Sequence, residues 1–208
     1  MDNFLKYQNE IASIQYTINL LLWELKINAP KDSEKDLIDL ISYHEKNLFS
    51  MQTSIQYSNL LKAAMESLEY QTLSEEEKRY IQNLLRHYEK NKKVPTDFYE
   101  EYSKMKATAN VVWRRAKEKN NYKLFEPYLR KIIELTKKYY KYIYPNIDNL
   151  YDAMLNEYEI GIGSELIDKL FSDLKNGIIH LIPFEESNDD QLNFDFTEQQ
   201  LMDCANYL

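Results

Sequence analysis

Glycine and proline are scarce in this sequence, which has only 3 Gly and 5 Pro among 208 residues, while 44% of the residues are hydrophobic and 29% are charged. β-Sandwiches and β-barrels need many turns rich in these residues, and disordered chains contain fewer apolar residues, so both classes are disfavoured. The apolar residues instead recur at the helical period of three and four. We therefore predict an all-α fold of long antiparallel helices.

Cysteine is almost absent, since Cys204 is the single one in the chain. A single cysteine excludes an intramolecular disulfide and any zinc or iron–sulfur site built from several cysteines. The first ten residues are polar, unlike a signal peptide, and no run approaches the ~20 apolar residues of a transmembrane helix. We predict a cytoplasmic location and no membrane partner.

Basic residues are also fewer than acidic residues. The chain has 26 Lys and Arg against 34 Asp and Glu, which gives a net charge of -8. A protein of this charge repels nucleic acid and anionic lipid through its own field. We expect no nucleic-acid partner, whereas basic partners or neutral substrates fit better.

Helix start and stop signals divide the chain into segments. Ser74 and Glu77 form a capping box, in which each side chain accepts a hydrogen bond from the other residue's backbone. No Gly or Pro interrupts residues 33–71, which predicts one continuous helix roughly 55 Å long at about 1.5 Å per residue. The predicted helices run over residues 3–28, 33–71, 74–90, 96–120, 125–143, 147–157 and 164–181. We expect Pro127 in the first turn of its helix and Ser164 as a helix cap.

The last of these helices has an apolar stripe that we expect to be buried, formed by Leu166, Ile167, Leu170, Phe171, Leu174, Ile178 and Leu181. The backbone is expected to bend just before it, where Gly161 and Gly163 lie close together. After it, Pro183 opens an acidic stretch, and Thr197 and Gln200 repeat the capping-box pattern. We predict a helical domain over 1–182, followed over 183–208 by an acidic loop and the start of a truncated helix. A short C-terminal helix is the alternative to truncation.

The histidines offer no metal site. A zinc peptidase of the zincin type needs H-E-x-x-H, because two imidazoles one helical turn apart face one metal. That motif does not occur, and His44, His87 and His180 fall on three different predicted helices. We expect His44 on a packed apolar face, His87 at the surface and His180 at a helix end. We assign no residue of this chain a catalytic or metal-binding role.

Other catalytic patterns are missing as well. The three glycines, Gly161, Gly163 and Gly177, do not have the spacing of a phosphate loop or of a G-x-S-x-G turn. We interpret Cys204 as a structural thiol, because no base is placed near it by residue spacing. The consecutive residues Glu75, Glu76 and Glu77 are best explained as charges that complement a helix N-terminus.

Tyrosine is the abundant residue type, with 18 copies, four of which are Tyr139, Tyr140, Tyr142 and Tyr144. These four point around the whole helix, so they cannot all face one core. Two interpretations remain open. The rings could line a groove that grips peptide backbone, or they could pack an aromatic-rich helix with their hydroxyls in water.

Three segments carry a resemblance to a known family. The first, over residues 113–129, is a tryptophan–alanine helix followed by a polar break and a proline–leucine helix start. The second, over residues 151–161, reads Y-D-A-M-L-N-E-Y-E-I-G and is followed at matching spacing by residues 166–174. The third lies near the start and contains Leu22-Trp23-Glu24 and Ala29-Pro30. The residues that carry the resemblance are Trp113, Ala116, Phe125, Pro127, Leu129, Tyr151, Asp152, Tyr158, Glu159, Gly161 and Phe171. Together the segments resemble the thermostable metallocarboxypeptidases typified by carboxypeptidase Taq, whose third segment has Leu-x-Trp-Asp and Met-Pro. Ile160, Glu24 and Ala29 depart from the family pattern.

The resemblance implies that this chain is the N-terminal helical half of a zincin-type carboxypeptidase that removes single C-terminal residues from peptides with zinc or cobalt. The metal ligands of that family lie beyond the matching region, so no functional residue is carried over, and this chain by itself is expected to hold no metal and to be inactive. Its expected partners are the remaining catalytic half of the same polypeptide, the peptide substrates of the longer protein and, in a homo-oligomer such as a dimer, a second copy. The alternative is a free-standing helical module that binds or interacts with other molecules.

Overall fold

The computed structural model describes residues 1–180, 197, 199, 200 and 202, and it forms two compact units, Met1–Gly161 and Ile162–Leu208. Throughout these described residues the regular structure is helical, which confirms the predicted all-α fold. The helices are α1 (Asp2–Ile27), the short 3-10 helix η1 (Lys31–Ser33), α2 (Glu34–Gln52), α3 (Ile55–Glu66), α4 (Leu68–Thr72), α5 (Glu75–Asn91), α6 (Thr96–Glu118), α7 (Tyr122–Ile143), α8 (Leu150–Tyr158) and α9 (Ser164–Ile178). Among the helices described, none is both long and apolar enough to cross a membrane.

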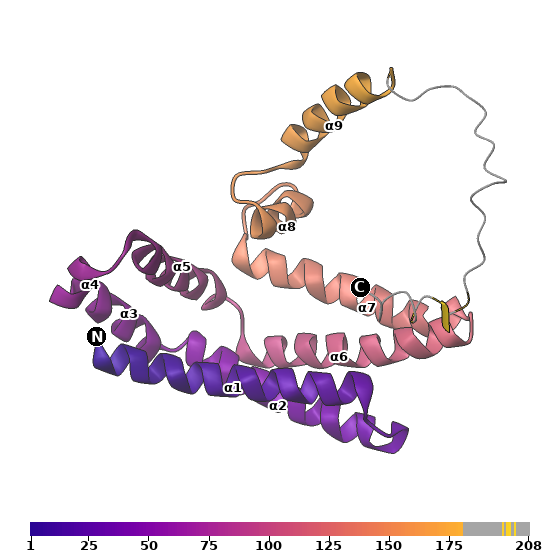
Figure 1. Cartoon of the computed structure of the whole chain (residues 1–208), viewed down its shortest axis with the longest axis horizontal. Helices are drawn as coiled ribbons and strands as arrows, with labels where there is room; N and C mark the ends of the chain where they lie inside the picture. The colour runs from indigo at the N-terminus through magenta and orange to yellow at the C-terminus, as the bar shows by residue number, and fades with distance from the viewer. Residues whose placement is uncertain (181–196, 198, 201, 203–208) are drawn as a thin grey trace. The chain divides into compact units, whose positions relative to one another are not determined.

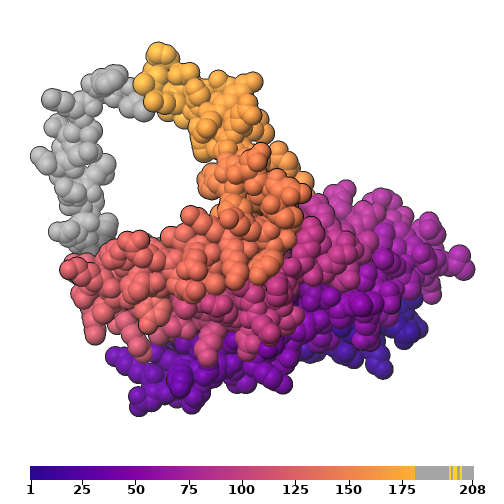
Figure 2. Space-filling model, turned by 180° about the vertical axis from the view of Figure 1, so that it is seen from behind, coloured from indigo at the N-terminus to yellow at the C-terminus, as the bar shows by residue number. Residues whose placement is uncertain are grey.

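In the first unit, four long helices lie side by side in the order α1, α2, α6 and α7 (Figure 1). The opposite face shows the same sequence of bands, from the indigo and purple N-terminal helices to the salmon of α7 (Figure 2). The shorter helices α3, α4 and α5 lie at the N-terminal end of α1 (Figure 1). Helix α8 follows α7 and contacts it.

Ion pairs join α2 to α6 in an antiparallel register. The pairs are spread along the interface. A residue near the start of α2 pairs with one near the end of α6, and a residue near the end of α2 pairs with one near the start of α6. The pairs are Glu34 with Arg115, Asp39 with Lys104 at 2.5 Å, and Lys46 with both Glu100 at 2.6 Å and Asp97 at 3.2 Å. Exposed pairs of this kind add little stability but favour one register of the two helices.

Three clusters of buried side chains form the core of the first unit. One joins α1 to α3, α4 and α5 around Leu61, whose side chain is 0% exposed. A second lies between α1, α2 and α6 around Ile41, and a third packs α6 and α7 around Leu135. Burial of these apolar stripes is what holds amphipathic helices in place.

The prediction of one helix over 33–71 is wrong, because the chain breaks twice in this stretch. Ser54 and Ser67 adopt extended backbone angles, and their hydroxyls accept hydrogen bonds from the amides of Tyr57 (3.0 Å) and Tyr70 (3.3 Å). A serine hydroxyl that caps a new helix competes with continuation of the old one. Helices α2, α3 and α4 are the result.

Three smaller corrections concern helix starts. Helix α7 begins at Tyr122, so Pro127 lies inside it rather than in its first turn. Gly163 is the N-cap of α9, and Ser164 is its first residue rather than its cap. Helix α8 begins at Leu150, three residues later than predicted, where the Asn149 side chain accepts a hydrogen bond from the amide of Tyr151.

Both capping boxes are confirmed. The Ser74 amide donates to Glu77 at 2.8 Å, and the Glu77 amide donates to the Ser74 hydroxyl at 3.2 Å. Thr197 and Gln200 exchange the same pair of bonds, at 2.9 and 3.3 Å. The domain boundary predicted between residues 182 and 183 and the acidic loop after it lie outside the described residues and stay predictions.

The expected burial of the α9 stripe is wrong. Helix α9 buries none of its residues, and its apolar side chains are exposed except that of Ile167, which is half-buried. The largest exposed fractions are 62% for Leu170 and 60% for Phe171. Leu181, the last member of the predicted stripe, lies outside the described residues.

Candidate functional site

The described residues do not form a metal site. They contain no group of three or more His, Cys, Asp or Glu side chains that could hold an ion. His44 is half-buried on α2 beside the ring of Tyr43, His87 is exposed on α5, and His180 is exposed just after α9. Zinc needs three or four converging ligands, so the described part of the chain does not fit a catalytic zinc ion. Cys204 lies outside the described residues.

Tyr99 and Tyr102 of α6 pack with the tyrosines at the end of α7 in an aromatic cluster rather than an open groove. The ring of Tyr99 stacks on Phe49 with a centroid distance of 3.9 Å, and Tyr102 stacks on Tyr139 at 5.4 Å. Two of the hydroxyls bond to neighbouring helices: that of Tyr139 donates to Asn91 at 2.9 Å, and that of Tyr102 shares a hydrogen bond with Thr136 at 3.2 Å. This geometry supports the packing interpretation of the tyrosine-rich segment.

The ionisation of these tyrosines is suppressed. Burial raises the pKa of Tyr99 and of Tyr139 far above the ordinary value, with nearby acidic and phenolic groups acting in the same direction. Burial, followed by the charge of Glu157, raises the pKa of Tyr140 to about 12. At neutral pH all three hydroxyls are therefore protonated hydrogen-bond donors and cannot act as bases.

A polar network ties α8 to α5 and to the end of α7. The Lys90 ammonium lies 2.7 Å from the Glu157 carboxylate, which also accepts the Tyr144 hydroxyl at 2.8 Å. Asn156 donates to the Tyr144 oxygen at 3.1 Å, and its own carbonyl oxygen accepts the amide of Gly161 at 2.9 Å. Gly161 has φ +86, a conformation that favours glycine.

The charges of this network stabilise each other. Partial burial acts to raise the pKa of Glu157, but hydrogen bonds from Lys90 and Tyr144 outweigh it and hold the pKa below the ordinary value. Burial likewise disfavours the Lys90 ammonium, yet its hydrogen bonds to Glu157 and Tyr144 raise its pKa. Sequence reasoning missed this network, because no local pattern connects residues 67 positions apart.

The family-motif residues of the first segment meet where α6 turns into α7. Trp113 and Phe125 line an open pocket of about 350 Å³ together with Lys117, whose ammonium lies 5.4 Å from the centre of the Trp113 ring. Ala116 also lines this pocket and is buried, Leu129 is half-buried and Pro127 is exposed.

The remaining motif residues are not gathered at this pocket. Tyr151, Tyr158 and Glu159 are exposed on or next to α8, and Asp152 is half-buried there. Phe171 is exposed on α9. The structure therefore does not bring the motif residues together into one site. The structural role expected for them from the resemblance stays a prediction.

A comparison with protein-family models identifies the family of this chain. The model for the carboxypeptidase Taq (M32) metallopeptidases matches residues 3–206. The chain belongs to this family. The resemblance found in the sequence is thereby confirmed.

The carboxypeptidase Taq relatives are longer than the present chain. Carboxypeptidase 1 of Bacillus subtilis is 31% identical over 179 residues, which are 86% of this chain and 35% of the relative. Thermostable carboxypeptidase 1 of Pyrococcus furiosus is 30% identical over 85% of this chain and 34% of its own length. The chain spans about a third of the length of the curated relatives it matches.

Solved structures confirm the helical fold. The BsuCP crystal structure matches 99% of this chain and 42% of its own, with a TM-score of 0.87 and 27% identity. The Pyrococcus furiosus carboxypeptidase structure matches 86% of this chain and 35% of its own, with a TM-score of 0.65 and 26% identity. The fold is therefore that of part of a carboxypeptidase Taq protein.

Proposed function

We propose that this chain is the N-terminal helical part of a zinc-dependent carboxypeptidase that releases single C-terminal residues from peptides. One observation carries the proposal. The family match covers residues 3–206, while this length is only about a third of the curated relatives. The described residues also lack a group that fits a metal ion, so the metal ligands would come from the remaining catalytic half of the polypeptide.

In this proposal the chain contributes scaffold rather than chemistry. Hydrolysis with zinc requires ligands, an activated water and a carboxylate-binding group that converge on one cleft. The helices described here would wall or roof that cleft, and peptide substrates would bind to the longer protein. The 208-residue chain alone would be inactive.

A zinc titration tests the proposal that this chain supplies no metal ligands. Calorimetric titration of the 208-residue chain with zinc is expected to give only weak binding, of the kind shown by scattered surface carboxylates. Stoichiometric zinc at sub-micromolar affinity, lost when any one of His44, His87 or His180 is changed, would overturn the proposal. The reading frame after Leu208 supplies an independent check, because an H-E-x-x-H motif is expected there.

The exposed stripe of α9 favours a second candidate, an interaction module derived from the same scaffold. Leu166 and Leu174 are 53% and 51% exposed, and with Leu170 and Phe171 they give one helix an unburied apolar face. Such faces commonly bind a partner, which here would be the catalytic half or a second copy of the chain. A stop codon after Leu208 together with a stable dimer in analytical ultracentrifugation would favour the module.

A further inference from the structure

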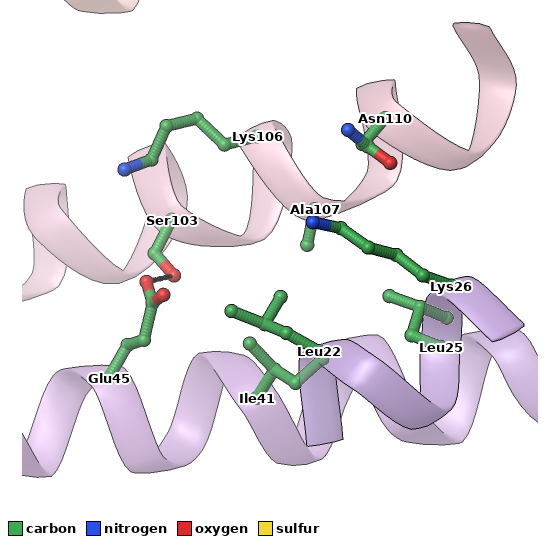
Figure 3. A pocket seen from close by; sticks show the side chains of 9 residues that line it. All are labelled: Leu22, Leu25, Lys26, Ile41, Glu45, Ser103, Lys106, Ala107 and Asn110. Atoms are coloured by element: carbon green, nitrogen blue, oxygen red, sulfur yellow. Dashed lines mark hydrogen bonds between the residues drawn. The ribbon is translucent and has the colours of Figure 1, made fainter. Parts of the chain in front are cut away.

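A small pocket between α1, α2 and α6 combines both signs of charge with an apolar floor. Its volume is about 200 Å³, and its lining residues come from three helices (Figure 3): Leu22, Leu25, Lys26, Ile41, Glu45, Ser103, Lys106, Ala107 and Asn110. In the close-up, the Glu45 carboxylate is directed at Ser103, and Leu22 and Ile41 lie between Glu45 and Lys26.

Among the described residues, Glu45 of α2 faces α6 without a cationic partner. The neighbouring acids Glu34 and Asp39 each pair with a basic residue of α6. Among the described residues Glu45 forms no ion pair, and its carboxylate accepts a hydrogen bond from the Ser103 hydroxyl, whose residue is only 2% exposed. A half-buried carboxylate with one neutral donor retains free acceptor sites for a cation.

The opposite side of the pocket offers donors. The Lys26 ammonium and the Asn110 amide line it, and within the described chain neither side chain has a hydrogen-bond or ion-pair partner. The Lys106 ammonium is drawn on the other side, toward Ser103 and Glu45 (Figure 3), and lies 4.7 Å from the centre of the Tyr102 ring. The Glu45 carboxylate at one end, the donors of Lys26 and Asn110 at the other and the aliphatic side chains between them match a small zwitterion.

We propose that this pocket binds a free α-amino acid with an aliphatic side chain. The Glu45 carboxylate accepts hydrogen bonds from the ligand's ammonium group, and Lys26 and Asn110 donate to its carboxylate. The aliphatic side chain packs on Leu22 and Ile41. A cavity of about 200 Å³ has room for a small ligand such as one amino acid. The inference does not depend on the proposed peptidase activity.

Titration of the isotope-labelled 208-residue chain, followed by the NMR shifts of its backbone amides, tests the proposal. L-Leucine is expected to shift the amides of Leu22, Glu45 and Ser103 saturably, with a Kd of about 10 mM or lower. N-acetyl-L-leucine lacks the ammonium group and L-leucinamide lacks the carboxylate. Each is expected to bind about tenfold more weakly, since each lacks the charge-assisted hydrogen bonds that leucine makes at one end of the pocket.

Variants check that binding depends on the pocket. Glu45→Gln keeps an oxygen for the Ser103 hydroxyl but loses the charge, so leucine binding should weaken about tenfold, as it should in Lys26→Ala. Glu10→Gln, at an exposed position of α1, is the control and should bind as the unchanged chain does. The proposal fails if leucine gives no saturable shifts, if the two blocked analogues bind as well as leucine, or if Glu45→Gln leaves binding unchanged.

Discussion

Helices α6 and α9 are both amphipathic, yet they end up in opposite environments. Helix α6 buries six residues along its length, among them Phe98, Ala109 and Val111. Helix α9 carries apolar residues at the same helical spacing and buries none of them. The apolar residues of α6 meet α2 and α7 within the first unit.

The difference teaches that a periodic pattern specifies a helix and a face but not what covers the face. In the first unit the covering helices are part of the chain, so its core is closed. For α9 the free energy of burying the stripe, about 25 cal/mol per Å² of apolar surface, is still available to a binding partner.

A leucine-to-alanine substitution should lower the free energy of unfolding much more in the core of the first unit than on the exposed stripe of α9. Leu61→Ala removes a side chain that is 0% exposed and should lower the free energy of unfolding by about 2 to 5 kcal/mol. Leu170→Ala changes a side chain that is 62% exposed and should alter it by less than about 0.5 kcal/mol. Urea unfolding followed by circular dichroism measures both. Equal losses of unfolding free energy at the two positions would contradict the contrast between the buried core and the exposed stripe.

The Lys90–Glu157 ion pair should contribute more to the free energy of unfolding than the exposed ion pairs do. Their side chains are 16% and 25% exposed, so Glu157→Gln should cost about 1 to 2 kcal/mol at neutral pH. The Glu89–Lys92 pair is the matched control, because its side chains are 48% and 40% exposed. Glu89→Gln should cost no more than about 0.5 kcal/mol.

The cost of Glu157→Gln should depend on pH. Because folding lowers the pKa of Glu157, its stabilising contribution is complete above the unfolded value of about 4.3 and is lost as the pH falls through the folded value. The stability difference between the unchanged chain and the variant should therefore shrink as the pH is lowered from about 6 to about 3. A difference that stays constant over this range would show that the charge of Glu157 contributes nothing.

The smallest effect concerns the breaks in residues 33–71. Ser54→Ala removes the acceptor for the amide of Tyr57 and should lower the free energy of unfolding by about 1 kcal/mol. Ser50→Ala, at an exposed position inside α2, is the control and should be neutral or slightly stabilising. A gain of stability and of helical signal in Ser54→Ala would mean that the capping serine does not cause the break.

Sequence reasoning predicted the fold better than it predicted contacts. Capping residues are local signals, which is why the start of α5 at Ser74 and Glu77 is predicted correctly. Ser54 and Ser67 were missed because a serine within an apolar pattern fits the middle of a helix as well as a cap. Lys90 and Glu157 meet only through the packing of α5 and α8, which no local pattern encodes. For the same reason, the resemblance at Trp113 and Phe125 indicated the family but not which motif residues lie together.

Release of C-terminal residues from peptides would show directly whether the 208-residue chain is an inactive part of a longer carboxypeptidase. Unstructured peptides would be incubated with zinc or cobalt and either the 208-residue chain or the contiguous longer product, and the released amino acids would be counted over time. The account predicts that the longer product releases C-terminal residues one at a time and that the 208-residue chain releases none. Stepwise release by the 208-residue chain, or none by the longer product with metal present, would contradict it.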